Sequence, residues 1–130
     1  MGKEGFKGLK VWEKGKNLAV HVYQITDQGQ FAKDFSLRDQ IRRAAVSIAS
    51  NIAEGDELGT DKQSVRHFLI AKGSAAEVIT QAEIASEIAY ISVESCKYIS
   101  DECTEILKML SKLILVRSKN LKGMGSEPKA

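Results

Sequence analysis

The residues with which this chain could carry out acid–base or metal chemistry are few and poorly spaced. Glu77, Glu83 and Glu87 could supply a pair of carboxylates, but at about 100° per residue they point in different directions, and no nucleophile is evident near them. Neither His21 nor His67 has a Glu three residues before it, as di-iron helical bundles require. Glycine-rich phosphate loops and nucleophile elbows are also absent from the sequence. We therefore expect no enzyme activity, no metal and no cofactor.

Phosphate binding is the second chemistry that the residue types allow. Basic residues recur in two neighbouring segments, and several copies gathered in an oligomer could contact phosphate groups. No aromatic residue is interleaved with the arginines, so the stacking of single-stranded bases is not supported. The alternative interpretation is a solvated or salt-bridged face. The candidate nucleic-acid contacts are Arg38, Arg42, Arg43, Lys62 and Arg66.

Charge is unevenly distributed along the 130 residues, although the net charge is only +2. The ends are basic, at +3 for residues 1–20 and +4 for residues 105–130, whereas residues 56–104 carry −5. The acidic middle could meet a basic protein partner instead of a nucleic acid. The N-terminus has no apolar signal region and no window approaches the roughly 18 apolar residues of a membrane span, which predicts a cytoplasmic protein with no membrane partner.

A polar seam borders the apolar face of the segment 36–55. Gln40, Ser47, Asn51 and Glu54 fall on one side of a helix, and polar groups beside a core need hydrogen-bond partners. Glu54 would lie in the last turn, where a carboxylate faces the negative end of the helix dipole. We expect it to meet a donor from another segment or subunit. A structural role for the seam is favoured over a binding role.

Four amphipathic helices are predicted to position these residues, over 11–26, 36–55, 60–89 and 92–118. In the second, apolar residues from Leu37 to Ile52 recur with the spacing of one helical face. Ser36 and Thr60 are predicted N-caps, and Gly55 is predicted to end the second helix. Short connections predict an all-α, antiparallel up-and-down four-helix bundle in one domain, 11–118. Residues 1–10 are expected to be flexible, 27–35 a loop, and 119–130 a disordered basic tail.

Two of these helices have a second apolar side. Ile70, Ile84 and Ile88 project away from the core stripe of their helix, and Val46, Ala49 and Ala53 lie outside that of theirs. Apolar residues on two sides predict burial on two sides, so we expect association with copies of the same chain or with a partner. Gly73 lies among small residues and predicts a close approach between helices, which would offset its poor helix propensity.

The run from Gln40 to Gly55, QIRRAAVSIASNIAEG, resembles the signature of the bacterial four helix bundle family, also called 23S rRNA-intervening sequence proteins. The resemblance covers residues 6 to about 116 and includes FLIAKGS at Phe68 to Ser74. It implies an up-and-down bundle assembled into a ring-like homo-oligomer, expected to be a pentamer. It also implies a structural motif of Gln40, Ser47, Asn51, Glu54, Gly55, Gly73, Ser74, Glu77 and Gln81.

The family's relatives include accessory proteins of diversity-generating retroelements, which bind nucleic acid and a reverse transcriptase. The resemblance thus implies phosphate contacts by Arg42 and Arg43, and structured RNA or DNA, or a reverse transcriptase or other protein, as partners. Asp56 and Glu57 depart from the basic residues that many members have after this motif, and would repel phosphates there. Two hypotheses follow: a nucleic-acid-binding accessory protein, or a protein-interaction scaffold with an acidic surface.

Overall fold

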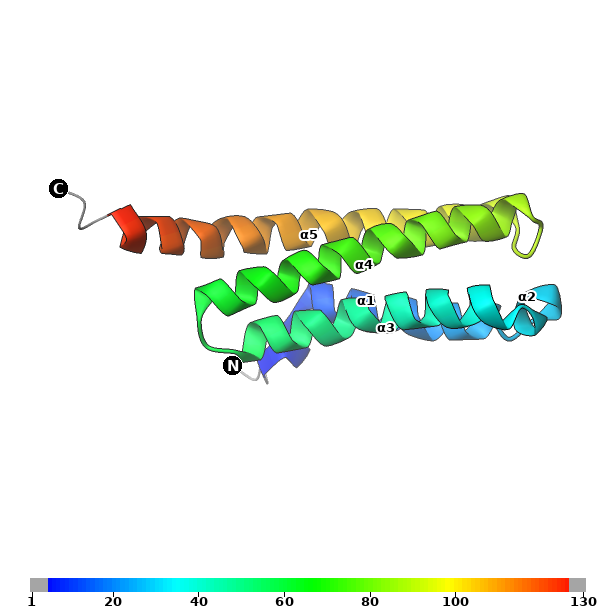
Figure 1. Cartoon of the computed structure of the whole chain (residues 1–130), viewed down its shortest axis with the longest axis horizontal. Helices are drawn as coiled ribbons and strands as arrows, with labels where there is room; N and C mark the ends of the chain where they lie inside the picture. Colours follow the sequence, from blue (N-terminus) through cyan, green and yellow to red (C-terminus); the bar gives the residue numbers. More distant parts are fainter. Residues whose placement is uncertain (1–4, 127–130) are drawn as a thin grey trace.

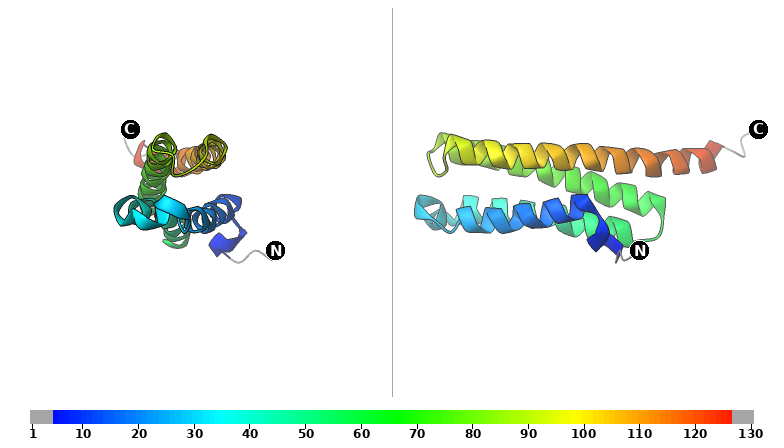
Figure 2. Two further views of the ribbon diagram at one scale, coloured as in Figure 1. Left: turned by 90° about the vertical axis from the view of Figure 1, so that its right-hand side faces the viewer. Right: turned by 180° about the vertical axis from the view of Figure 1, so that it is seen from behind.

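The chain is all-α, as the sequence predicts. The computed structural model describes residues 5–126, with side chains to Leu121, and the predictions for 1–4 and 127–130 lie outside this range. Its elements are the 3₁₀-helix η1 (Gly5–Gly8) and the α-helices α1 (Lys10–Ile25), α2 (Gly29–Lys33), α3 (Phe35–Glu57), α4 (Asp61–Glu87) and α5 (Val93–Ser126). The four long helices lie side by side (Figure 1). Figure 2 shows two layers, with α4 and α5 stacked on α3 and α1.

A single core fills the space between the layers. α1 packs on α3, α3 on α4 and α4 on α5, whereas α1 and α5 touch over a smaller area. The contacts between α1 and α5 include the Lys14–Glu102 ion pair at 3.0 Å and the edge-on rings of His21 and Tyr98. The largest fully buried side chains are Phe31, Phe68, Leu18, Ile41, Ile48, Ile52, Ile99, Ile106 and Leu110. No helix in the described part of the chain is apolar over a length that would cross a bilayer.

The start of α3 differs from the prediction. Asp34, not Ser36, is the N-cap, because its carboxylate accepts the Leu37 N–H at 3.1 Å, and Asp caps helices as well as Ser does. The expected loop 27–35 contains the short helix α2. Phe31 is fully buried there. Phe35 is 63% exposed, although its apolar side chain would be expected to pack on the core.

Gly55 does not end α3, so that prediction is wrong. The helix continues to Glu57, and Gly59, at φ +51°, occupies the left-handed conformation of the turn. Gly55 is needed for packing instead, since a Cβ there would lie 2.7 Å from Cε1 of Phe68. The ring of Phe68 on α4 is therefore what excludes a larger side chain at position 55.

The ends of the later helices follow their caps more closely. Thr60 accepts the Gln63 N–H at 3.2 Å and Ser92 accepts the Ser95 N–H at 3.0 Å, which confirms both predicted helix starts. α5 continues to Ser126, past residue 118, where this helix was predicted to end. Leu and Lys are the commonest residues from Ile106 to Lys122, and no glycine interrupts the helix before Gly123.

The N-terminal segment contains a short helix that was not predicted. Residues Gly5–Gly8 form η1, and the ring of Phe6 packs edge-on against Trp12 with 5.3 Å between centroids. This contact anchors the described part of the predicted flexible segment 1–10 to α1. The segment thereby becomes one wall of an apolar groove described below.

Candidate functional site

The polar seam of α3 is satisfied by α4 through a continuous hydrogen-bonded chain. Ser74 Oγ donates to Ser47 Oγ at 2.9 Å, and Asn51 Nδ2 donates to the Ser47 carbonyl and hydroxyl at 2.9 and 3.0 Å. Asn51 Oδ1 lies 2.9 Å from His67 Nδ1, which is 3.3 Å from Glu54 Oε1. Glu54 thus has a partner from another segment, as expected. His67 is the member that sequence analysis missed, because nothing in one sequence shows that it lies opposite Asn51.

The other end of the seam is less completely paired. Gln40 Nε2 donates to Ser36 Oγ at 3.3 Å, within its own helix. Gln81 Oε1 is buried, and no described group lies within hydrogen-bond distance of it. A small cavity of about 210 Å³ opens here between α3 and α4, lined by Gln40, Arg43, Ala44, Ser47, Glu77 and Gln81. The polar seam of α3 is therefore paired with α4 from Ser47 to Glu54 and open at Gln40.

The three arginines of α3 do not form one phosphate-binding cluster. Arg38 donates from Nε to Asp39 at 2.9 Å and from Nη1 to the Ala32 carbonyl at 3.2 Å. Arg42 donates from Nε to Thr26 Oγ1 at 2.8 Å, and its guanidinium stacks 4.5 Å from the Tyr23 ring centroid. Both arginines tie α3 to neighbouring segments. Arg43 is exposed and lies at the edge of the small cavity.

Lys62 and Arg66 are exposed on the first turns of α4. One further cation on this helix, Lys72, lines a hollow of about 470 Å³ that it shares with α5. The α5 side of the hollow consists of Thr104, Leu107, Lys108, Ser111 and Lys112. The sequence-based candidates include no residue of α5.

Arg117 explains the acidic residues at the α3–α4 turn. Its Nη1 donates to Ser64 Oγ at 2.8 Å and to Asp61 Oδ1 at 3.3 Å, while Nη2 lies 3.9 Å from Asp56 Oδ1. The guanidinium also lies 6.0 Å from the Phe68 ring centroid. Asp56, which departs from the pattern that the resemblance implies, is therefore one of two carboxylates that bind α5 to this turn.

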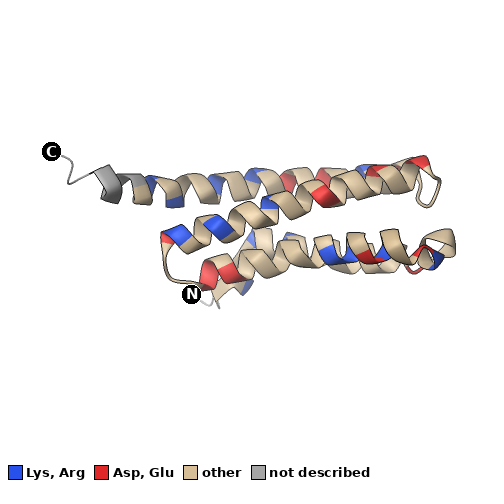
Figure 3. Ribbon diagram, in the orientation of Figure 1, with Lys and Arg blue, Asp and Glu red and all other residues tan. Residues whose placement is uncertain are grey.

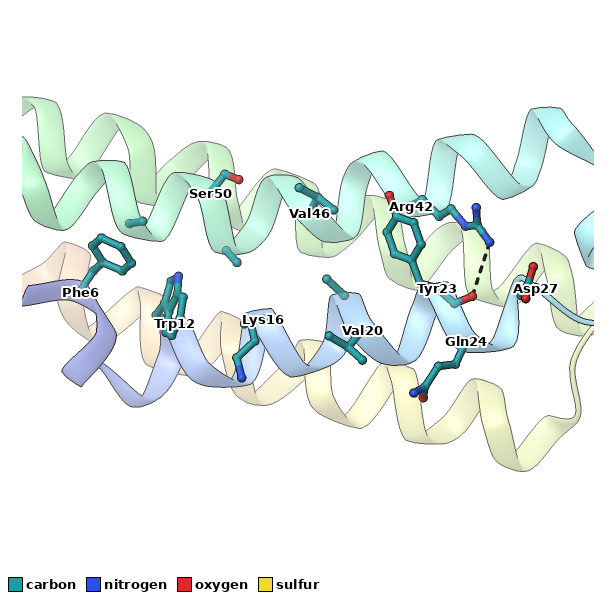
Figure 4. Close-up of a pocket in the computed structure, with 13 residues that line it drawn as sticks. Phe6, Trp12, Lys16, Val20, Tyr23, Gln24, Asp27, Arg42, Val46 and Ser50 are labelled. Atoms are coloured by element: carbon teal, nitrogen blue, oxygen red, sulfur yellow. Dashed lines mark hydrogen bonds between the residues drawn. The ribbon is translucent and has the colours of Figure 1, made fainter. Parts of the chain in front are cut away.

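An open apolar groove of about 900 Å³ runs between α1 and α3 (Figure 4). Its rims expose Val20, Tyr23 and Val46, each between 41% and 51% exposed. Phe6 and Trp12 close one end of the groove, and Arg42 and Asp27 lie at the other. The predicted interface residues Val46, Ala49 and Ala53 all line it.

A second apolar surface lies on α4. Ile70, Ile84 and Ile88 are 43%, 47% and 48% exposed, so the chain itself does not cover them. A Cβ on Gly73 would meet nothing within 4 Å, so the predicted close helix approach does not occur within the subunit. The described residues contain no group of three or more His, Cys, Asp or Glu side chains arranged to hold a metal ion.

The chain is similar to a known protein family in sequence and to a solved structure in fold. Residues 7–112 match the model of a family described as 23S rRNA-intervening sequence protein. A 1.70 Å crystal structure of a protein of unknown function from the S23 ribosomal protein family, from Bacteroides thetaiotaomicron VPI-5482, is similar, with a TM-score of 0.74 and 29% identity. The match covers 80% of this chain and 97% of that one. No curated protein matches the chain.

Proposed function

The chain belongs to the 23S rRNA-intervening sequence protein family, and on that premise we propose that it is a non-enzymatic subunit of a homo-oligomeric ring that binds structured RNA or DNA as an accessory protein. Each subunit would be an up-and-down four-helix bundle, and the ring a pentamer. The observation that carries the proposal is the presence of two separate uncovered apolar surfaces: the α1/α3 groove and the isoleucine face of α4.

Two unlike surfaces on one subunit are what a ring requires. In a head-to-tail interface one patch of a subunit contacts a different patch of the next, and the assembly closes if the rotation between neighbours divides a full turn. A groove that presents Trp12, Tyr23 and Val46 offers a concave surface, and Ile70, Ile84 and Ile88 on a helix offer a convex one.

The assembly can be tested by measuring the mass of the native protein by light scattering and native mass spectrometry. We expect a single oligomer, five times the subunit mass, for the unmodified protein. Val46→Asp and Ile84→Asp should each reduce it to monomers, since each places a carboxylate in one of the two apolar surfaces. Val93→Asp is the matched control, because Val93 is 73% exposed on neither surface. A monomeric wild-type protein at micromolar concentration would refute the ring.

Nucleic-acid binding is supported by six basic side chains on α4 and α5 that are exposed or line the shared hollow, and by multiplication of these charges in an oligomer. Anisotropy of labelled duplex RNA and duplex DNA across a salt series would test it. We expect binding that weakens steeply as salt rises. Failure of both probes to bind at low salt would remove this function.

The protein-interaction scaffold remains the second candidate, and one observation favours it. Residues 77–105 contain seven Asp or Glu and a single Lys, so the ends of α4 and α5 nearest their connection form an acidic surface. A basic protein partner would suit this surface. Purification from the native host should then yield a stoichiometric protein without nucleic acid.

A further inference from the structure

The hairpin of α4 and α5 is divided along its length into two halves of opposite charge. Residues 62–76 of α4 and 106–121 of α5 carry seven Lys or Arg and no Asp or Glu. These two segments, which we call the basic half, run side by side: Ser64 is hydrogen-bonded to Arg117, and Lys72 shares its hollow with Lys108 and Lys112. The opposite half contains the acidic residues described above. Figure 3 shows the separation of blue and red along both helices.

Most charges of the basic half have no internal partner. Arg117 is paired with Asp56 and Asp61, but no described carboxylate lies within 4 Å of the other six cations: Lys62, Arg66, Lys72, Lys108, Lys112 and Lys119. Lys108 and Lys112 are four residues apart on one helix, where like charges destabilise the helix by a few tenths of a kcal/mol. This arrangement adds nothing to the stability of the fold, and an anionic ligand would relieve its repulsion.

The hollow between the helices gives the basic half a defined centre. Lys72 of α4 lines one side of the hollow, and Lys108 and Lys112 of α5 line the other. Lys108 and Lys112 are four residues apart, which is about one turn and about 6 Å along the axis of α5. Ser111 also lines the hollow, and so does Thr104, whose hydroxyl already donates to the Ser100 carbonyl at 2.8 Å. Three lysines and a serine that line one hollow are residues suited to a phosphate group, which lysine binds as a point charge.

The composition of the hollow indicates which part of a nucleic acid it would contact. No aromatic side chain lines it, so it has no platform on which a base could stack. Lys108 and Lys119 are 11 residues apart, or about 16 Å, which corresponds to about five phosphates of one duplex strand at 3.4 Å each. The surface therefore fits a row of backbone phosphates rather than exposed bases.

We propose that the basic half of the α4–α5 hairpin is the docking surface for the phosphate backbone of a nucleic-acid duplex, with Lys72, Lys108 and Lys112 around one phosphate. This inference rests on the proposed nucleic-acid function and moves its site. The site moves from α3 to α5, because Arg38 and Arg42 are engaged within the fold whereas Lys108, Lys112 and Lys119 of α5 have no carboxylate partner among the described residues. Lys62 and Arg66 remain as flanking contacts.

The test compares two triple variants with equal losses of charge. Lys72→Gln, Lys108→Gln and Lys112→Gln together remove the centre of the basic half. The control changes Lys7, Lys10 and Lys33 to Gln, three exposed lysines outside the hairpin. With labelled duplex RNA and duplex DNA, we expect the first variant to bind about 100-fold more weakly at low salt and its log K against log salt slope to fall by about 2 to 3. The control should change the slope by less than 1.

The possible results separate this inference from the proposed function. Equal binding by the two triple variants would overturn the docking surface while leaving nucleic-acid binding in place, and no binding by the wild-type protein would remove both. Loss of binding accompanied by dissociation of the oligomer would also overturn it, because the lysines would then lie between subunits. Loss of binding to both duplexes with the helical circular dichroism and native mass unchanged supports it. Lys→Arg at the same three positions should restore binding.

Discussion

Replacing Gly55 by Ala tests the packing of α3 on α4 most directly. Ala is normally favoured over Gly in a helix interior by about 1 kcal/mol, so the change would ordinarily stabilise the protein. Here the new methyl group would lie 2.7 and 2.9 Å from two ring carbons of Phe68. Phe68 is fully buried and cannot turn away without disturbing the core. Overpacking of this kind costs about 1 to 3 kcal/mol.

Gly73→Ala is the matched comparison, because Gly73 is also in a helix interior but a Cβ there meets nothing within 4 Å. The gain in helix propensity is common to both variants, so the difference between their free energies of unfolding isolates the overpacking. We expect Gly73→Ala to be the more stable by about 1 to 3 kcal/mol. At about 4 °C per kcal/mol for a domain of this size, their melting temperatures should differ by about 4 to 12 °C.

The assay is urea and thermal unfolding followed by circular dichroism, with native mass confirming that both variants keep the same assembly state. Gly55→Ala should lower the melting temperature or leave it near that of the wild type, while Gly73→Ala should raise it. Equal stabilisation by the two substitutions would contradict the reasoning, since the ring of Phe68 could not then lie against Gly55.

Three further predictions concern buried polar and titratable groups. Asn51→Leu should destabilise the fold by about 1 to 3 kcal/mol in urea unfolding, because it leaves His67 and Ser47 without their shared partner; an unchanged midpoint would argue against the chain of hydrogen bonds. Burial lowers the pKa of His21 below its ordinary 6.5, so the unfolded state binds more protons and stability should fall as pH drops below about 6.5; His21→Leu should flatten this dependence, and an unaltered profile would count against it. Burial, with a smaller contribution from Glu102, raises the pKa of Cys103 to about 12, so the native thiol should resist a thiol reagent at pH 8 and react on unfolding; rapid native labelling would be inconsistent with its burial.

The helices themselves were predictable because their signals are local. Apolar spacing from Leu37 to Ile52 and the caps at Thr60 and Ser92 act within a few residues of chain, and the structure has these elements. The exposure of Ile70 and Ile84 was likewise visible in their angular position on one helix. Prediction was weaker where two local signals competed, as at Asp34 and Ser36, which are both good caps.

The candidate site was only partly predictable. The seam from Ser47 to Glu54 was identified as needing partners, but His67 and Ser74 could be assigned to it only after α4 was placed against α3. Arg42 has the residue type of a phosphate contact, yet its position beside Tyr23 and Thr26 engages it within the fold. Residue type and spacing indicate what a side chain is able to bind. They do not indicate which groups of the folded chain already contact it.

By itself, then, the sequence determined the all-α class, the helical periodicity, the surplus of apolar surface and the amount of charge. Only the tertiary structure decided where that charge gathers. Residues 56–104 as one stretch are acidic, but α4 and α5 run in opposite directions, which brings Lys72 beside Lys108 and Lys112. The same arrangement turns Gly55 from an apparent helix end into a packing position against Phe68. The physical reason is that electrostatic and steric interactions act through distance in space, and the antiparallel packing of the helices sets that distance.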